Sequence, residues 1–292
     1  MEIKDFIKDM TAFRNTSPDT AFNISDETCK GWYSKLFSEL YTSLKETTQE
    51  KIDFLHPWTR VCDKYSRVVA RDVVDDIYFN IDVKKISDAD VMKGKTKEWF
   101  ILLEKLCGTN YAKKLIPSEE NDDEKMQFVE DVRTTVNKFR GNIGEIPIAW
   151  FSENHLFSKY YGDYTPYTDT YHPDVDAYGT TKGGHKVAIQ IKNYSYIKKV
   201  SPDVFGKVWN HFTKMPEFGC EDLTIKEIKK DIHGIVMSIG SKGYFGDDTQ
   251  KTLEKDYGKS ILLIDCDEIN EILTPNTQHK MELFEGLASI FN

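Results

Sequence analysis

The sequence contains no apolar run that approaches the ~20 residues of a transmembrane helix, so it predicts no membrane partner. It also lacks the pattern of a secretory signal peptide, because Met1–Phe6 is acidic and amphipathic. With 39% hydrophobic and 30% charged residues, the composition is that of an ordinary water-soluble protein. We therefore expect an intracellular, cytoplasmic protein, and a nuclear or viral context stays open.

Cysteine is scarce and scattered along the chain. The sequence has five cysteines, with no C-x-x-C pair and no close Cys/His set: Cys29, Cys62, Cys107, Cys220 and Cys266. Isolated cysteines of this kind are typical of free thiols in a reducing compartment. They argue against both a disulfide framework and a structural zinc site.

Two common enzyme signatures are missing as well. No strand-like segment leads into G-x-G-x-x-G, which excludes a Rossmann-type dinucleotide site. No G-x-S-x-G elbow is present, so nothing supports serine-hydrolase chemistry. The net charge of −9 argues against indiscriminate coating of nucleic acid. It does not exclude a local basic surface, because affinity depends on where the lysines lie.

A hairpin signal is the most informative feature that the sequence does contain. Two β-prone runs, Val175–Tyr178 and Lys186–Ile191, flank the polar turn Thr180–Gly184. Side chains alternate between the two faces of a strand. Gln190 and Lys192 are therefore expected on one face, and the apolar residues that alternate with them on the other.

The first strand of this hairpin carries two acids. Asp174 and Asp176 fall on its polar side, so strand pairing predicts that carboxylates, an amide and an ammonium group converge above a buried apolar face. That combination suits phosphodiester hydrolysis. A carboxylate holds a hard divalent cation through oxygen, and the cation activates a water molecule. A neighbouring lysine can orient or deprotonate that water, or neutralise the transition state.

At these residues the chain resembles the PD-(D/E)xK nuclease superfamily. Pro173–Asp174 matches the first half of the motif and Gln190–Lys192 the second half. Glutamine stands where an acid is commoner, which is similar to the variant found in Mrr-type restriction endonucleases. The departure leaves one fewer negatively charged ligand for a metal.

The resemblance implies a role for each motif residue. Asp174 is expected to bind Mg²⁺ (or Mn²⁺), with Asp176 open as a second ligand. Gln190 is expected to line the metal site, and Ile191 to supply its backbone carbonyl as a metal ligand. Lys192 is expected to position the attacking water.

Nuclease cores of this superfamily usually begin with a helix that contributes a glutamate to the metal site. Residues 125–139 have apolar side chains at helical spacing, and Arg140–Gly144 predicts a turn. A new helix is expected after that turn, because Pro147 suits a first helical turn. Glu145 then matches the family glutamate by position, with Glu153 as the alternative.

Later elements extend the resemblance beyond the hairpin. A helix is predicted over Ser201–Met215, and the apolar runs His233–Gly240 and Lys259–Asp265 are predicted as buried strands with a helix over 248–257 between them. This order favours parallel pairing of the last two strands. The resemblance covers residues 125–285 and implies an α/β fold with a restriction-endonuclease-like mixed central sheet flanked by helices.

We expect two domains joined by a short linker. Residues 1–116 predict a mainly helical N-terminal domain, a candidate for substrate recognition that resembles no family. The polar, acidic stretch 117–124 predicts the linker. Residues 125–292 then form the nuclease-like catalytic domain.

A local excess of lysine follows the hairpin turn. Residues 186–215 hold six lysines against one acid, and positive charge beside a metal site is what a polyanionic substrate needs. Lys198, Lys199 and Lys207 are therefore predicted to contact nucleic acid.

The leading hypothesis is a Mg²⁺-dependent endodeoxyribonuclease with DNA as its partner. A related nuclease acting on branched or single-stranded DNA or on RNA would use the same site, so that alternative stays open. A non-catalytic nucleic-acid-binding module that keeps the fold is the third hypothesis. Cleavage of both strands of a duplex would favour a homodimer.

Overall fold

The computed structural model describes most helices and strands of the chain. The described residues are 26–45, 55–78, 94–113, 122–153, 157, 159–166, 174–181, 183–194, 200–239, 247–273 and 285. Everything stated below concerns these residues.

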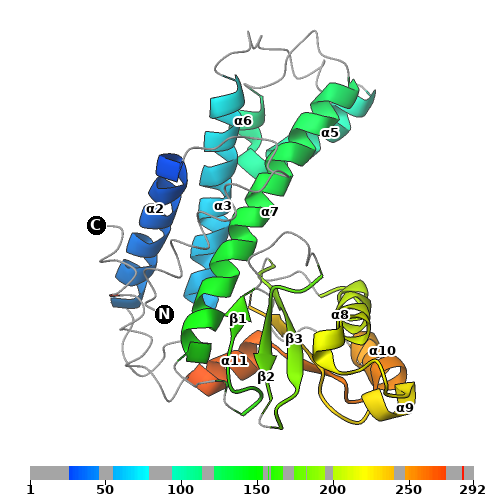
Figure 1. The fold of residues 1–292 in the computed structure, drawn as a ribbon. Coiled ribbons are helices and arrows are strands. Elements are labelled where there is room, and N and C mark those ends of the chain that lie inside the picture. The colour runs from blue at the N-terminus through cyan, green and yellow to red at the C-terminus, as the bar shows by residue number, and fades with distance from the viewer. Residues whose placement is uncertain are drawn as a thin grey trace.

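The described N-terminal part consists of helices, as predicted for residues 1–116. Figure 1 shows α2 and α3 as long neighbouring helices, with α5 and α6 at the far end of the bundle. α3 lies at the centre of this part, because it contacts α2, α5 and the later helix α7. The bounds are α2 (Asp26–Lys45), α3 (Leu55–Tyr78), α5 (Gly94–Cys107) and α6 (Thr109–Ala112).

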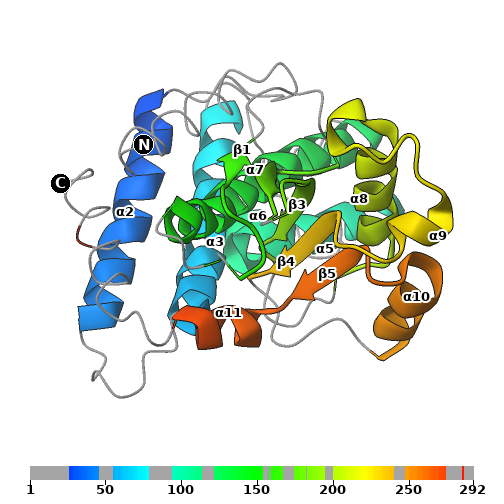
Figure 2. The ribbon, with the colours of Figure 1, turned by 60° about the horizontal axis from the view of Figure 1, so that its bottom comes forward.

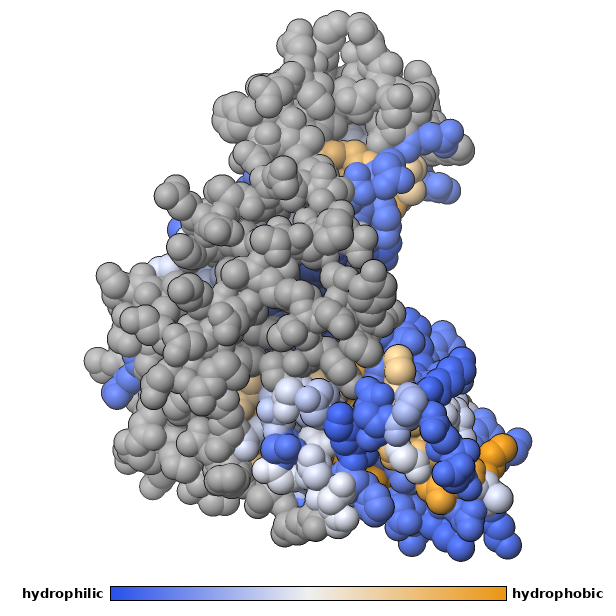
Figure 3. All heavy atoms as spheres, in the orientation of Figure 1, coloured by the Kyte–Doolittle hydropathy of each residue, from blue (hydrophilic) through white to orange (hydrophobic). Residues whose placement is uncertain are grey.

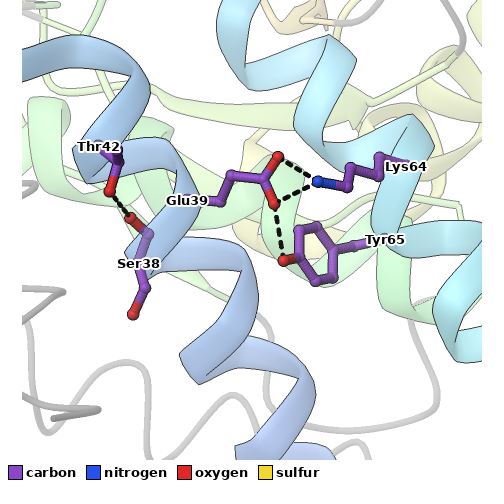
Figure 4. Close-up of polar contacts among 5 residues, drawn as sticks. All are labelled: Ser38, Glu39, Thr42, Lys64 and Tyr65. Carbon is purple, nitrogen blue, oxygen red and sulfur yellow. Dashed lines mark hydrogen bonds and ion pairs between the residues drawn. The ribbon is translucent and has the colours of Figure 1, made fainter. Parts of the chain in front are cut away.

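A polar cluster joins α2 to α3 at the edge of their apolar contact. Both oxygens of the Glu39 carboxylate accept from Lys64 Nζ, at 2.6 and 2.7 Å, and Oε2 also accepts from the Tyr65 hydroxyl at 2.8 Å (Figure 4). Burial and the bond to Glu39 raise the pKa of Tyr65 to about 12. The ion pair is largely exposed, so it contributes at most ~1 kcal/mol. The buried rings of Trp32, Phe37 and Trp58, including close Phe37–Trp58 packing, hold the helices together more strongly.

α7 (Asp122–Glu153) is one continuous helix of 32 residues, so the predicted turn at Arg140–Gly144 is wrong. Apolar side chains continue to be buried at helical spacing across that segment, from Phe139 to Ile143 and beyond. The packing of this face against α3 and α5 outweighs the weak helix propensity of glycine. Pro147 therefore lies inside the helix and does not open it.

The start of α7 overlaps the predicted linker, residues 117–124. The helix begins at Asp122, where acids in the first turn interact favourably with the helix dipole.

One cluster of buried side chains extends from the N-terminal helices to the sheet and includes Trp58, Phe139 and Ile189. The division into two domains at residues 117–124 stays a prediction, and residues 117–121 lie outside the described part.

The sheet has five strands in the order β1-β2-β3-β4-β5. β1, β2 and β3 pair antiparallel, and β3, β4 and β5 pair parallel, so the sheet is mixed, as predicted. The hairpin and the parallel pairing of the last two strands are also confirmed. The bounds are β1 (Thr165–Pro166), β2 (Ala177–Thr180), β3 (Lys186–Lys192), β4 (Gly234–Ser238) and β5 (Ile261–Ile264).

Short helices fill the connections of the parallel part. The predicted helices after the hairpin and between the last two strands are present as α8 and α10. The elements are α8 (Asp203–Lys214), the 3-10 turn η2 (Pro216–Phe218), α9 (Ile225–Ile228), α10 (Asp247–Tyr257) and α11 (Cys266–Leu273).

Helices cover the sheet on both sides, and the two faces of β3 separate as its alternation predicts. Val187, Ile189 and Ile191 are buried in the cluster that contains the N-terminal helices. Ala188 is buried with the inner face of α8. Figure 2 shows α8, α9 and α10 to the right of the strands and α2 and α3 to the left. The mixed sheet flanked by helices is therefore confirmed as the fold class.

A buried histidine at the start of β4 lies in surroundings that disfavour its charged form. His233 Nδ1 is 3.5 Å from Cys220 Sγ, and Nε2 has no hydrogen-bond partner among the described residues. Burial lowers the pKa of His233 below its ordinary value; the charge of Asp231 opposes this shift in part, and the nearby His185 adds to it. The folded protein therefore holds this imidazole neutral.

We expect the protein to lose stability as the pH falls below ~6.5, because the unfolded chain then binds a proton that folded His233 does not. The contribution is fully present above that pH. Replacing His233 with glutamine removes the group, so His233→Gln should lose less stability than the wild type between pH 7.5 and 5.5. Urea unfolding at both pH values measures this difference. An equal loss in both proteins would contradict the assignment.

None of the described helices combines the length and the apolar character needed to cross a membrane. Figure 3 shows mostly hydrophilic atoms over the described surface near α8, α9 and α10, with a small apolar patch. Leu223 and Ile225 are the exposed apolar side chains of that region. Isolated exposed side chains of this kind are ordinary on protein surfaces.

Candidate active site

The hairpin brings Asp176 against Gln190 at the end where β2 begins and β3 ends. Ala177 pairs with Ile189, and Asp176 N donates to the Ile189 carbonyl at 2.9 Å. Asp176 Oδ2 accepts from the Ile191 amide at 2.6 Å and from Gln190 Nε2. The predicted meeting of a carboxylate with the amide of the second motif half is therefore present.

Lys192 ends β3 on the same face as Gln190, because side chains two apart share a face. It is partly exposed and lines a cleft together with Asp176. Tyr194 follows at the next even position and lines the same cleft. Burial and then the charge of Asp176 raise the pKa of Tyr194 above its ordinary value. Sequence reasoning did not single out Tyr194, although the spacing from Gln190 and Lys192 signalled it.

Glu145 reaches the same cleft from the middle of α7. Its side chain is only 2% exposed, so it is a buried acid within the wall. The helix approaches the end of β3 very closely there, because a Cβ built on Gly144 would lie 2.5 Å from Asn193 Cβ. The structure therefore brings Glu145 together with Asp176 and Lys192. The side chain of the alternative, Glu153, lies outside the described part.

Asp174 does not share this cleft. Its Oδ1 lies 3.8 Å from Lys207 Nζ on α8, in a partly exposed ion pair. The reason is the pairing register: hydrogen bonding to β3 begins at Asp176, so Asp174 lies in the turn before the paired segment and faces another helix. The pairing register therefore places Asp176, and not Asp174, in the cleft. Which of the two acids binds a metal stays a prediction.

The predicted nucleic-acid contacts are not gathered here either. Lys207 faces Asp174 and does not line the cleft. Lys198 and Lys199 lie outside the described residues. The cleft does contain other cations. Two of them, Arg67 and Lys105, come from helices that were predicted from the sequence to belong to a separate N-terminal domain.

Two hydrogen bonds and an ion pair connect the end of β3 to α7 and α3, and we call this group of contacts the brace. It was not predicted from the sequence. Asn193 Nδ2 donates to the Arg140 carbonyl at 2.8 Å, and Arg140 Nε donates to the Asn193 carbonyl at 3.4 Å. The Arg140 guanidinium also forms an ion pair with Asp63 of α3. The backbone that carries Lys192 is thus held from two helices.

The cysteine nearest this brace is unsuited to nucleophilic catalysis. Cys62 is fully buried, and burial raises the pKa of its thiol to about 12. The thiol therefore stays protonated near neutral pH, whereas a nucleophilic cysteine needs the thiolate. Cys62, Cys107, Cys220 and Cys266 are all free and buried, in agreement with the free thiols that were predicted.

The donors of the cleft fit a hard divalent cation by their chemistry. Asp176 and Glu145 line the cleft with carboxylates, and Ile191 lines it as well. The Ile191 carbonyl accepts a long 3.4 Å contact from Gln190 Nε2, and the same amide nitrogen bonds Asp176. Oxygen donors of this kind suit Mg²⁺ or Mn²⁺. No group of three or more His, Cys, Asp or Glu side chains in the described part is placed to hold a metal. A metal here would therefore depend on two acids with an amide and a carbonyl.

The cleft is large and predominantly cationic. It has a volume of about 870 Å³ and is lined by residues of α3, α5, α7 and the end of β3. Five of the lining residues are cationic and three are acidic. The cations are Arg67, Lys105, Lys138, Arg140 and Lys192. Asp176 and Lys192 lie in this lining, and Gln190 contacts Asp176 from outside it. A cleft with this excess of positive charge can bind an anionic substrate and polarise it.

Comparisons of this chain with protein-family models, with curated proteins and with solved structures give no match. The residues and geometry of the cleft are therefore the basis for assigning a function. A fold class alone does not imply a function.

Proposed function

We propose that the chain is a metal-dependent endonuclease that hydrolyses DNA phosphodiester bonds, with a restriction-endonuclease-like fold of the PD-(D/E)xK type. The observation that carries the proposal is the contact of Asp176 with Gln190 and the Ile191 amide at the end of the hairpin. Lys192 follows on the same face, and the buried acid Glu145 lines the same cleft. Gln190 and Lys192 are the second half of the motif that resembles Mrr-type enzymes, and Asp176 lies two residues after the Asp174 of the first half.

Each residue has a role in this proposal. Asp176, Glu145, the Gln190 amide and the Ile191 carbonyl would hold Mg²⁺ or Mn²⁺. Such an ion, when bound, supplies Lewis-acid activation of water and stabilisation of charge on the phosphate. The Lys192 ammonium orients the attacking water or neutralises the developing negative charge.

The proposal commits to DNA, although a related nuclease with another target would use the same residues. The site chemistry is common to duplex DNA, branched DNA, single strands and RNA, since each presents the same phosphodiester bond. Substrate choice therefore depends on the other residues that line the cleft and not on the residues that hold the metal and the attacking water. A substrate panel separates these targets directly.

The direct test is cleavage of a substrate panel in Mg²⁺, with EDTA as the blank. Lys192→Ala should lower the cleavage rate by ~10²-fold or more, in line with the usual contribution of general acid–base groups. Lys186→Ala is the matched control, because Lys186 begins the same strand and lies over the Tyr178 ring. Equal rates for Lys192→Ala and the wild type on every substrate would remove the proposal.

A second reading has a specific observation in its favour. Gln190 supplies no negative charge, and no three-acid group exists in the described part of the chain, which suits a nucleic-acid-binding module without catalysis. Calorimetry with Mg²⁺ and Mn²⁺ separates the two readings. Heat of binding that Asp176→Asn abolishes supports the nuclease, whereas no uptake of either ion supports the binding module.

A further inference from the structure

Helices α3 and α5 of the N-terminal part contribute to the lining of the cleft. Arg67 of α3 and Lys105 of α5 line the cleft from that side, and both side chains are exposed. Neither forms an ion pair with any residue that the structure describes. Two solvent-exposed cations that come from separate helices therefore line the same cleft as Lys192.

The interior of the cleft adds positive charge that its own acids do not neutralise. Arg140 pairs with Asp63 through Nη1, but its buried Nη2 has no hydrogen-bond partner among the described residues. Asp63 is one of only three acids in the lining and is already engaged. Within a chain of net charge −9, this cleft gathers five cations against three acids. Such an arrangement attracts anions locally.

The remaining lining indicates which part of a nucleic acid would be bound. The neutral polar side chains are hydroxyls and amides, such as Ser66, Thr134 and Asn137, and the only aromatic ring in the described lining is Tyr194. Grooves for single strands use several aromatic rings on which bases stack. Contacts from Arg, Lys, Ser, Thr and Asn are typical of phosphate and sugar binding.

We propose that α3 and α5 form a phosphate-binding wall, in which Arg67 and Lys105 contact the sugar–phosphate backbone of a duplex nucleic acid. The inference rests on the proposed function, since it supplies the substrate contact of the same cleft. It assigns a task to the N-terminal helices, which lie outside the part of the chain that resembles a nuclease. These helices complete the substrate cleft instead of forming a separate recognition module.

The test is binding of a labelled duplex of about 20 base pairs, followed by fluorescence anisotropy in EDTA, where no cleavage takes place. The double variant Arg67→Ala/Lys105→Ala should bind at least ~10-fold more weakly, because each phosphate contact adds a charge-assisted hydrogen bond. The slope of log K against log [salt] should become shallower by ~2, since each lost phosphate contact changes it by ~0.9. The wild type should also bind the duplex more tightly than a single strand of equal length.

The matched control is Lys226→Ala/Lys251→Ala, which removes the same charge from exposed positions on α9 and α10 that do not line the cleft. It should keep the wild-type affinity and salt slope. Thermal unfolding of each variant confirms that it is folded.

Three outcomes would overturn the wall: no duplex binding by the wild type, equal affinity in both double variants, or tighter binding of the single strand. Because the assay contains no divalent ion, its result does not depend on the cleavage test. Weakened duplex binding by Arg67→Ala/Lys105→Ala, with no cleavage activity in the wild type, would support the phosphate-binding wall and contradict the proposed nuclease activity. Normal binding by Arg67→Ala/Lys105→Ala together with Lys192-dependent cleavage would support the nuclease and contradict the phosphate-binding wall.

Discussion

Replacing Asp176 with asparagine is expected to lower the Mg²⁺-dependent cleavage rate by ~10²–10³-fold, the usual cost of removing one preorganised charge-stabilising group. Asp176 Oδ2 accepts from the Ile191 amide and from Gln190 Nε2. Asparagine keeps the volume and one acceptor oxygen, so the hairpin should stay folded. What it loses is the negative charge that a divalent cation needs, because Asp176 and Glu145 are the two acids proposed to hold the ion.

Asp174→Asn is the matched control for this experiment. The two acids are separated by a single residue, but Asp174 pairs with Lys207 outside the cleft. We expect Asp174→Asn to keep the wild-type rate within about threefold, because a partly exposed ion pair contributes little. Initial rates at saturating Mg²⁺ measure both variants. A large loss in Asp174→Asn together with an unchanged rate in Asp176→Asn would return the role to Asp174.

The second large effect is expected at Gly144, where α7 meets the end of β3. A Cβ at this position would lie 2.5 Å from Asn193 Cβ, a distance that real side chains do not tolerate. Gly144→Val should therefore destabilise the protein by ~1–3 kcal/mol, the usual cost of overpacking. Asn193 follows Lys192 directly, so relief of the clash also displaces the site. The cleavage rate should fall even at temperatures where the variant is fully folded.

Gly31→Ala is the control for a glycine within a helix. Nothing lies within 4 Å of a Cβ built on Gly31 in α2. Alanine should thus stabilise the protein by up to ~1 kcal/mol through helix propensity alone, with no change in cleavage. Chemical denaturation and the cleavage assay together measure both variants. Gly144→Val with wild-type stability would show that the approach of α7 to β3 is not as close as described.

Local patterns were sufficient to predict the elements of the sheet and its coverings. The alternation of Val187, Ile189 and Ile191 with Gln190 and Lys192 predicted β3 and its two faces, because a strand has a period of two residues. Continuous apolar runs predicted β4 and β5 as buried strands. These predictions hold because they depend on side chains that are neighbours along one strand.

The helix α7 shows where a local signal fails. Gly141 and Gly144 favour a turn by propensity, but the buried face of Phe139 and Ile143 continues across them and keeps the helix intact. At Gly144 the helix comes so close to the residue after β3 that an added Cβ would lie 2.5 Å from Asn193 Cβ. Gly144, which suggested that the helix ends, instead allows α7 to pack against the end of β3. This role can be recognised only when the position of β3 is known.

The amino-acid sequence alone therefore determined the hairpin and the types of residue on its polar face, because strand alternation and turn chemistry act over a few neighbouring residues. The choice of Asp176 over Asp174 required the pairing register, because two acids on one predicted face differ only in which one lies opposite β3. The cationic wall of Arg67 and Lys105 required the packing of α3 and α5 beside residues more than eighty positions later in the chain. Contacts over such separations depend on how whole faces bury one another, and no short stretch of sequence records that.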